Sequence, residues 1–317
     1  MRLNMAAFST VLIVALSFQF VSQSADAGEV VTDDLRQQAK QFIQNEGLQP
    51  FQPAPNTVAV LYFRNRTRRP DIDPLQKGLA VMLITDLAKV KEIRVVERAQ
   101  LQALAEELQL GTSGLVTPDT APRIGRLLGA RYVVGGDLGI VPSEQITIAG
   151  NLTEMPQITL LGSPSSEGPL EDLLRMEKEV VFEIIRLLQI TLTPDEIEEL
   201  RKPFTVDLEA LMRFSLGIES SDRAAYEEAA AHYREALQRD PGLEAAGAAI
   251  QELTRLRLIS PRPGPDALLR SLHRRVSVNE GPVQGPITRR EFSEPVSIQG
   301  PGGTADTAGT ADVEIRW

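Results

Sequence analysis

The sequence predicts an α/β domain, followed by a small all-α unit and a tail that is largely disordered. Three observations lead to this expectation. Between residues 57 and 140, short β-branched runs alternate with stretches of helical periodicity, in the order strand, helix, strand, helix, helix, strand. Helical stretches without an intervening strand follow between residues 207 and 257. From Ser260 onward proline and glycine accumulate, and residues 300–311 have low complexity.

The composition limits the function. The 317 residues carry a formal net charge of -10, which argues against general nucleic-acid binding because that requires a basic face. There is no cysteine, so the fold has no disulfide and the sequence has no lipid-accepting thiol. A hydrophobic fraction of 42% is ample for a core.

Residues 1–27 have the pattern of a signal peptide. Arg2 precedes an apolar run from Met5 to Val21, and the segment ends in the small-residue site Ala25-Asp26-Ala27. Cleavage is expected between Ala27 and Gly28. The alternative, a membrane anchor, is disfavoured because the run is shorter than the roughly 20 residues of a bilayer span.

The next two regions are an N-terminal segment, 28–56, and the α/β domain, 57–203. The first contains a helix from Asp33 to Asn45 and a proline-rich linker. In the domain we expect strands at 57–63, 93–97 and 131–140, helices at 74–87, 99–110, 117–128 and 170–188, a short helix from Thr193 that ends before Pro203, and a hairpin that joins 145–149 to 157–161 through a turn at 150–156. Thr117 is the expected N-cap of the third helix.

Residues 57–140 resemble the CsgG family, the curli production assembly and transport component. The resemblance lies in Val58-Ala-Val-Leu-Tyr-Phe63, Leu79-Ala-Val-Met-Leu-Ile-Thr-Asp-Leu87, Ile93-Arg-Val-Val-Glu-Arg98 and Ile124-Gly-Arg-Leu-Leu-Gly-Ala-Arg-Tyr-Val-Val134, in this order and spacing. It implies an exported α/β domain that oligomerises or associates with the outer membrane and its secretion machinery. Two features depart from family members that form pores: the hairpin arms are about five residues long, against roughly 9–11 for a membrane strand, and the lipidated cysteine is missing.

Residues 208–241 resemble one tetratricopeptide repeat, within a helical unit at 207–257. Gly217, Tyr226, Ala230, Tyr233 and Asp240-Pro241 carry the resemblance. It implies a protein-binding role, with Tyr226 and Tyr233 as candidate contact residues. One repeat cannot bury its own faces, so we expect this unit to pack on the helix after it or on the α/β domain.

No residue pattern predicts catalysis, a metal or a cofactor. The two histidines, His232 and His273, are far apart, and neither lies near a nucleophile or carboxylate motif. Gly135-Gly-Asp-Leu-Gly139 lies in an expected strand and lacks the spacing of a phosphate loop, so it indicates a bulge or a close backbone approach.

Charged residues supply the remaining candidates. Arg64, Arg66, Arg68 and Arg69 form either a solvated connection or a contact surface for an acidic partner, for anionic lipid headgroups or for a neighbouring subunit. The tail, 258–317, is basic and is a candidate for contact with a membrane surface. Glu177, Glu179 and Glu183 are expected on the exposed face of their helix.

We therefore expect a non-enzymatic exported envelope protein that acts as an assembly or secretion accessory through protein–protein interaction. The alternative is a subunit of an oligomeric outer-membrane secretion channel of the curli-export type. The expected location is the periplasm, peripheral to the outer membrane. The expected partners are other envelope proteins and a second copy of the chain, with no nucleic acid and no cofactor.

Overall fold

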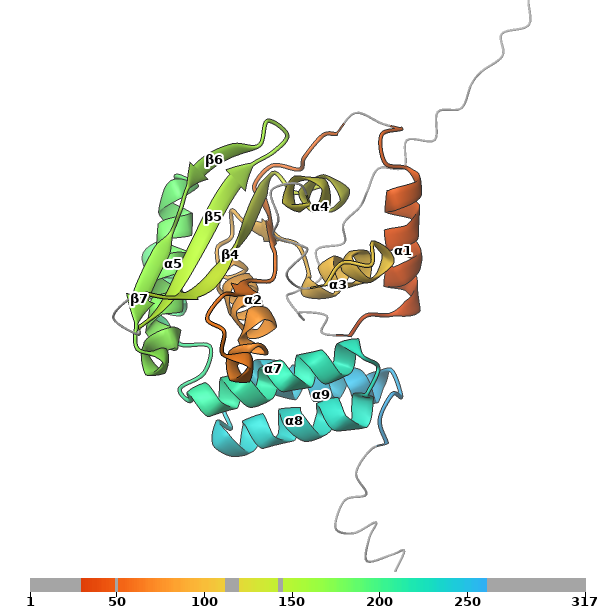
Figure 1. Cartoon of the computed structure of the whole chain (residues 1–317), viewed down its shortest axis with the longest axis vertical. Coiled ribbons are helices and arrows are strands. Elements are labelled where there is room, and N and C mark those ends of the chain that lie inside the picture. Colours follow the sequence, from red (N-terminus) through yellow and green to blue (C-terminus); the bar gives the residue numbers. More distant parts are fainter. Residues whose placement is uncertain (1–29, 49–50, 112–119, 142–144, 261–317) are drawn as a thin grey trace, which may run out of the picture. The chain divides into compact units, whose positions relative to one another are not determined.

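The computed structural model describes residues 30–48, 51–111, 120–141 and 145–260 (Figure 1). The chain divides into two units, Met1–Pro261 and Arg262–Trp317, and all described residues belong to the first. The expected signal peptide with its cleavage site at Ala27 and Gly28, the tail beyond residue 260 and the expected N-cap Thr117 lie outside the described residues.

The sheet of the described region has seven strands in the order β3-β1-β4-β5-β6, with β2 beside β4 and β7 beside β5. β1 pairs in parallel with β3 and β4, whereas β5 pairs antiparallel with β4, β6 and β7. The strands are β1 Thr57–Val60, β2 Arg64–Asn65, β3 Arg94–Val95, β4 Tyr132–Ile140, β5 Ile146–Glu154, β6 Thr159–Gly162 and β7 Ser165–Gly168. The expected mixed α/β content is present.

β4 and β5 form a hairpin with nine-residue arms, paired from Tyr132 with Glu154 to Ile140 with Ile146. The expected five-residue arm and the turn at 150–156 were wrong. Gly150 lies within β5, where a Cβ atom would be 3.1 Å from the carbonyl oxygen of Pro164. Because Gly150 has no side chain, the backbone at Pro164 can lie close to β5, and the glycine does not mark a turn. Gly136, in β4, confirms the expected close approach, because a Cβ there would lie 2.2 Å from the oxygen of Ala149.

Helices lie on both faces of the sheet (Figure 1). α2 and α5 pack on one face, and α4 covers part of the other. The helices of this part are α1 Asp33–Gln44, α2 Leu75–Leu87, α3 Arg98–Glu107, α4 Ala121–Leu127, α5 Leu173–Leu187 and α6 Pro194–Arg201, with 3-10 turns η1 Pro70–Ile72 and η3 Leu170–Asp172. α6 begins as expected, with a capping box formed by Thr193 and Glu196.

The N-terminal helix α1 is attached to this part of the fold by ion pairs. Arg36 of α1 bonds Glu106 of α3 at 3.1 Å, and Glu46 pairs with Arg123 of α4 at 2.8 Å. α1 therefore packs as part of the α/β layer structure, although the sequence placed it in a separate segment.

Three further helices, α7 Leu208–Asp222, α8 Tyr226–Arg239 and α9 Glu244–Arg255, form the helical unit. α7 packs on α2, where a Cβ at Gly78 would lie 2.0 Å from the Oγ of Ser215. Asp222 at the end of α7 pairs with Lys77 of α2 at 2.6 Å and with Arg98 of α3 at 3.0 Å. We expected the repeat to pack on the helix after it or on the α/β domain, and it contacts both: α8 packs on α9, and α7 packs on α2.

Candidate partner-binding site on the open face of the sheet

The two long strands alternate between a covered face and an open face. On the covered face Val134, Leu138, Ile148 and Leu152 are fully buried against α2 and α5. On the opposite face of β5, Ala149 and Asn151 are exposed. α4 lies over one end of this face (Figure 1).

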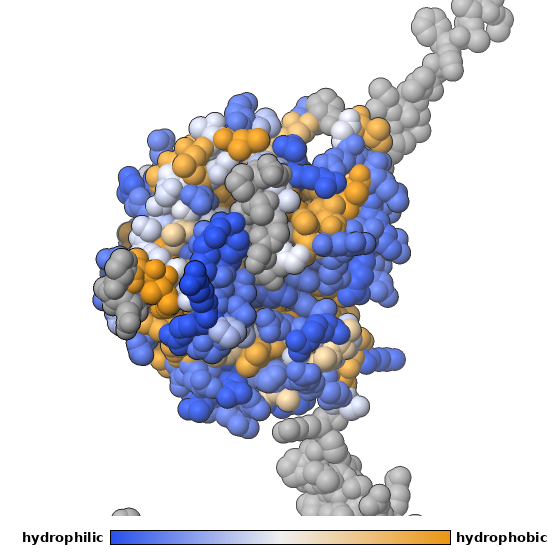
Figure 2. Space-filling model, viewed as in Figure 1, coloured by the Kyte–Doolittle hydropathy of each residue, from blue (hydrophilic) through white to orange (hydrophobic). Residues whose placement is uncertain are grey.

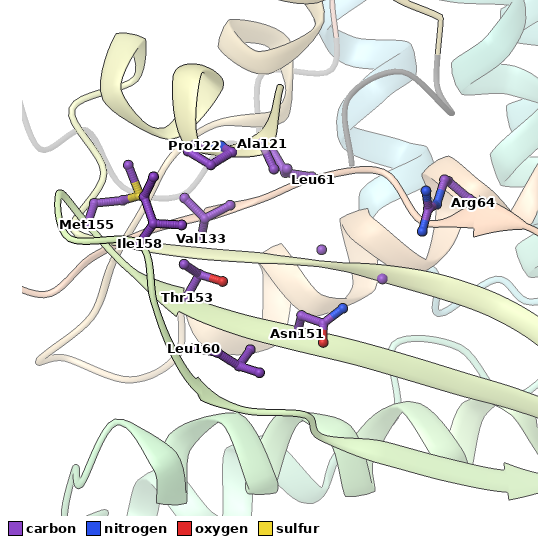
Figure 3. A pocket seen from close by; sticks show the side chains of 12 residues that line it. Leu61, Arg64, Ala121, Pro122, Val133, Asn151, Thr153, Met155, Ile158 and Leu160 are labelled. Carbon is purple, nitrogen blue, oxygen red and sulfur yellow. The ribbon is translucent and has the colours of Figure 1, made fainter. Parts of the chain in front are cut away.

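A cavity of about 400 Å³ lies on this open face, between α4 and the β5–β6 turn (Figure 3). Its volume is within the range of ligand pockets. Its lining is mainly apolar, with Arg64 at one end and Met155 and Ile158 at the other (Figure 3). The described lining residues are Leu61, Arg64, Ala121, Pro122, Val133, Gly135, Gly136, Asn151, Thr153, Met155, Ile158 and Leu160.

The apolar end of the cavity reaches the surface. Ile158 is 52% exposed and Leu160 is 56% exposed, and Figure 2 shows hydrophobic surface near this end of the sheet. Ile158 has a φ of 59°, in the left-handed region that a β-branched residue rarely adopts. That conformation costs about 1–2 kcal/mol. The turn therefore holds an apolar side chain in solvent with a strained backbone.

The other end of the cavity is positively charged. Arg64 binds Asp137 of β4 with two hydrogen bonds, Nε to Oδ1 at 2.5 Å and Nη2 to Oδ2 at 2.9 Å. The Nε of Arg66 lies 3.1 Å from the same Oδ2. Two guanidinium groups thus share one carboxylate, and one positive charge is left over. Arg66 is 58% exposed along its side chain, so most of its donors face solvent.

The loop that carries these arginines is ordered by its own polar side chains. The amide nitrogen of Asn65 donates to Asp73 at 2.7 Å and to the carbonyl of Arg69 at 2.8 Å, and its oxygen accepts from Thr67 at 2.6 Å. Arg69 pairs with Asp71 at 2.7 Å, and this bond raises the pKa of Arg69 and lowers that of Asp71. Of the four predicted arginines, the structure therefore brings Arg64 to the cavity, and Arg66 lies beside it on the same carboxylate of Asp137. Arg68 is exposed and Arg69 pairs within the loop.

The two predicted tyrosines lie elsewhere, in the helical unit. Tyr233 is fully buried, and a Cβ at Gly217 would lie 2.4 Å from its ring. It packs the interior of the unit, so its predicted contact with a partner was wrong. Tyr226 is half-buried against the same core.

The predicted exposure of Glu177 was also wrong. Its side chain is fully buried, whereas exposure was expected because its helix carries several acidic residues. Burial raises the pKa of Glu177 well above its ordinary value, and the nearby Asp86 adds to this effect. Glu179 and Glu183 are at least partly exposed, as expected.

Sequence reasoning missed Ile158 and Leu160 as functional candidates. Their signal was present: they are two apolar residues at alternate positions within the uncharged run 157–166. An interior strand would give the same pattern, so only their exposure identifies them.

The described residues contain no group of three or more His, Cys, Asp or Glu side chains that could hold a metal ion. None of the helices in the described ranges is long and apolar enough to cross a bilayer. Arg64, which lines the cavity, is bound by Asp137 of β4 through two hydrogen bonds.

Residues 37–141 match the family described as "Curli production assembly/transport component CsgG". This segment is a CsgG-family domain. The match confirms the predicted resemblance and begins within α1, before the expected boundary at residue 57. It ends at the close of β4, so the CsgG-family domain supplies Arg64, part of β4 and part of α4 to the cavity, while β5 and β6 lie beyond the match.

One curated relative is "Putative adenylate cyclase 3" of Rhizobium meliloti (strain 1021), which is 28% identical over 228 residues. The alignment covers 70% of this chain but only 37% of that protein, so the chain spans little more than a third of the relative's length.

Among solved structures, the LpoB C-terminal domain from Salmonella enterica aligns with 43% of this chain and 95% of its own, at 19% identity and a TM-score of 0.31. Lipoprotein GNA1162 from Neisseria meningitidis aligns with 44% of this chain and all of its own, at 14% identity and a TM-score of 0.32. TM-scores this low support no inference about shared fold or function.

Proposed function

We propose that this protein is a non-enzymatic accessory of the bacterial envelope that docks a partner protein at the cavity on the open face of its sheet. One observation carries the proposal: the strained turn residue Ile158 presents an exposed apolar side chain at the mouth of an apolar cavity. Exposed apolar groups around a hollow are typical of protein-binding sites.

The proposed envelope location rests on the CsgG-family domain and on the signal peptide expected at residues 1–27. In this proposal the protein is periplasmic and peripheral to the outer membrane. Whether the protein acts in secretion or in assembly depends on which partner protein occupies the cavity.

The helical unit has a proposed supporting role. The α7 face is occupied by α2, and Tyr233 is buried, so a tetratricopeptide-like recruiting surface would have to use the exposed sides of α8 and α9. In α8 these include Glu227, Glu228 and Arg234-Glu235, next to the half-buried His232.

Site-directed photo-cross-linking in cells tests the docking site. A photo-reactive amino acid replaces Ile158 or Leu160, and the matched control replaces Asp195, which is exposed on α6. We expect ultraviolet-dependent adducts with an envelope protein at both cavity positions and not at residue 195. An adduct with a second copy of the chain would favour the oligomeric channel, and no adduct at either cavity position would refute the docking site.

An activity assay tests the non-enzymatic part of the proposal. The purified protein is incubated with ATP and Mg²⁺ or Mn²⁺, and cyclic AMP is measured, because one relative is named an adenylate cyclase. We expect no product above the buffer control. Turnover that is lost on substitution of a single side chain would overturn the non-enzymatic assignment.

A further inference from the structure

The cavity has a charged end and an apolar end, and this polarity identifies the kind of segment that fits it. We propose that the cavity binds an extended segment of a partner protein that carries an apolar side chain and, about six residues away, a carboxylate. The inference rests on the proposed docking function and adds the chemistry of the partner.

The apolar end selects the first group. Met155, Ile158 and Leu160 surround it together with Pro122 of α4 (Figure 3). Because Ile158 and Leu160 are more than half exposed, an apolar side chain inserted here removes their surface from water along with its own. A polar side chain would find few partners among these atoms.

The charged end selects the second group. Arg64 and Arg66 share the single carboxylate of Asp137, and Arg66 keeps most of its donors for another acceptor. A carboxylate from the partner would balance the remaining positive charge and accept charge-assisted hydrogen bonds from Arg66. A basic segment would be repelled at the same place.

The width of the sheet and the register of its strands set the spacing. From β2, which carries Arg64, the path crosses β4 and β5 to reach Leu160 in β6, and three strand spacings of about 4.8 Å make about 14 Å across the sheet. Arg64 is in register with Asp137 of β4, whereas Leu160 is in register, through Thr153, with Val133, so the two ends are also offset by about 13 Å along the strands. The total of about 20 Å is spanned by an extended chain in about six residues. Between the two ends, the amide nitrogen of Asn151 points into the cavity (Figure 3), while its oxygen accepts from Ser163 at 3.2 Å. That nitrogen is placed to donate to a backbone carbonyl of the segment.

Fluorescent nonapeptides test this chemistry on the full mature chain. The first probe, Ser-Leu-Thr-Ser-Thr-Ser-Thr-Glu-Ser, carries both groups at the required spacing. The second replaces Leu by Ser, the third replaces Glu by Gln, and the fourth replaces Glu by Lys. We expect the first probe to bind at least about tenfold more tightly than each of the others in fluorescence anisotropy.

Three variants of the protein test which residues form the apolar end and the charged end of the cavity. Ile158→Asn removes the apolar rim but suits the left-handed backbone, so it should fold and still lose probe affinity. Arg66→Glu should lose affinity for the Leu/Glu probe and gain affinity for the Leu/Lys probe. Arg68→Glu, an exposed residue of the same loop, is the matched control and should change neither by more than about twofold.

The possible outcomes separate this inference from the docking function. Equal binding of all four probes, or binding of none, would overturn the segment chemistry. If a photo-reactive residue at position 158 still cross-links to a protein in cells, that failure refutes only the segment chemistry and leaves the proposed docking function supported. Binding to phosphatidylglycerol vesicles that is weakened equally by Arg66→Glu and Arg68→Glu, without probe binding, would instead assign the arginines to lipid headgroups and overturn the inference.

Discussion

The Glu177 carboxyl group is fully buried between α5 and α2, beside the buried carboxylate of Asp86. Asp86 is bound by Lys178 and, at 2.7 Å, by Lys89, whereas the Nζ of Lys178 is 3.9 Å from Glu177. The two lysines thus act mainly on Asp86. Burial raises the pKa of Glu177, Asp86 raises it further, and the lysines only partly offset this. Burial therefore favours the protonated form of Glu177 in the folded protein.

This inference predicts that stability falls as pH rises. Below the ordinary glutamate pKa, both folded and unfolded chains are protonated at residue 177. Above it, the unfolded chain loses the proton while the folded chain keeps it, so the free energy of unfolding declines by up to about 1.4 kcal/mol per pH unit until the folded pKa is reached. Glu177→Gln should therefore be more stable than wild type at pH 8 and converge with it near pH 4, in urea unfolding.

Glu183→Gln is the control on the same helix. Its hydrogen bond to Arg186 lowers the pKa of Glu183, so its contribution has the opposite sign and is weakened by solvent. Parallel stability curves for wild type and Glu177→Gln across this pH range would show that Glu177 is ionised in the fold.

Gly217 is the second residue whose role depends on a neighbour. Its missing Cβ leaves room for Tyr233, whose ring lies against Phe214 with centroids 5.6 Å apart. Gly217→Ala gains up to about 1 kcal/mol of helix propensity but overpacks this contact, which costs about 1–3 kcal/mol. We expect a net loss of stability in thermal unfolding.

Gly247→Ala is the matched control in α9. A Cβ there meets no atom within 4 Å, so this variant should gain stability by up to about 1 kcal/mol. Equal effects of the two substitutions would show that the contact between Gly217 and Tyr233 is not tight.

At the scale of elements, α2 explains why the helical unit and the α/β layers form one body. Ten of its thirteen residues are buried, because the sheet and α5 cover one side and α7 covers another. Asp222 of α7 meets Lys77 and Arg98, and the Arg98 side chain is only 1% exposed. A charge buried to this extent needs its partner.

Asp222→Asn should therefore destabilise the protein by about 3–5 kcal/mol, since it removes the carboxylate charge that Lys77 and the buried Arg98 share. Urea unfolding measures the change. Glu209→Gln, which breaks an exposed pair with Arg213 on the same helix, should cost no more than about 0.5 kcal/mol. A loss below about 1 kcal/mol for Asp222→Asn would mean that apolar packing alone holds α7 on α2.

At the scale of the whole molecule, the sequence predicts export and processing. The expected signal peptidase site requires small residues at Ala25 and Ala27. The intact mass of protein from the periplasmic fraction should correspond to a chain that begins at Gly28. Ala27→Asp should leave the precursor uncleaved, whereas Gly28→Ser should be processed normally. Full-length protein in the cytosol of wild-type cells would contradict the proposed location.

Much of the secondary structure could be predicted because its signals are local. Helical periodicity and end signals placed α1, α2, α5 and α6 within a few residues, and a run of β-branched residues located β1. The blocks that resemble the CsgG family lie in or next to β1, α2, β3, α4 and β4, so the family was also within reach of the sequence. These features depend on neighbours a few positions away in the chain.

The candidate site could be predicted only in part. The sequence singled out Arg64 and Arg66, but it could not show that Asp137, 73 positions from Arg64, would hold both of them. It missed Ile158 and Leu160, and it misplaced Glu177 and Tyr233, because exposure depends on which other elements cover a side chain.

The sequence by itself determined where most helices and the strand β1 form, which family the domain between residues 37 and 141 belongs to, and which charges are available. Only the tertiary structure decided which faces of these elements are buried. Lys77 and Asp222 are 145 positions apart, yet they are in contact where α2 packs on α7, and the repeat pattern did not predict which element covers that face of α7. The physical reason is that burial arises from contacts between distant segments, and a local pattern of residues does not contain them.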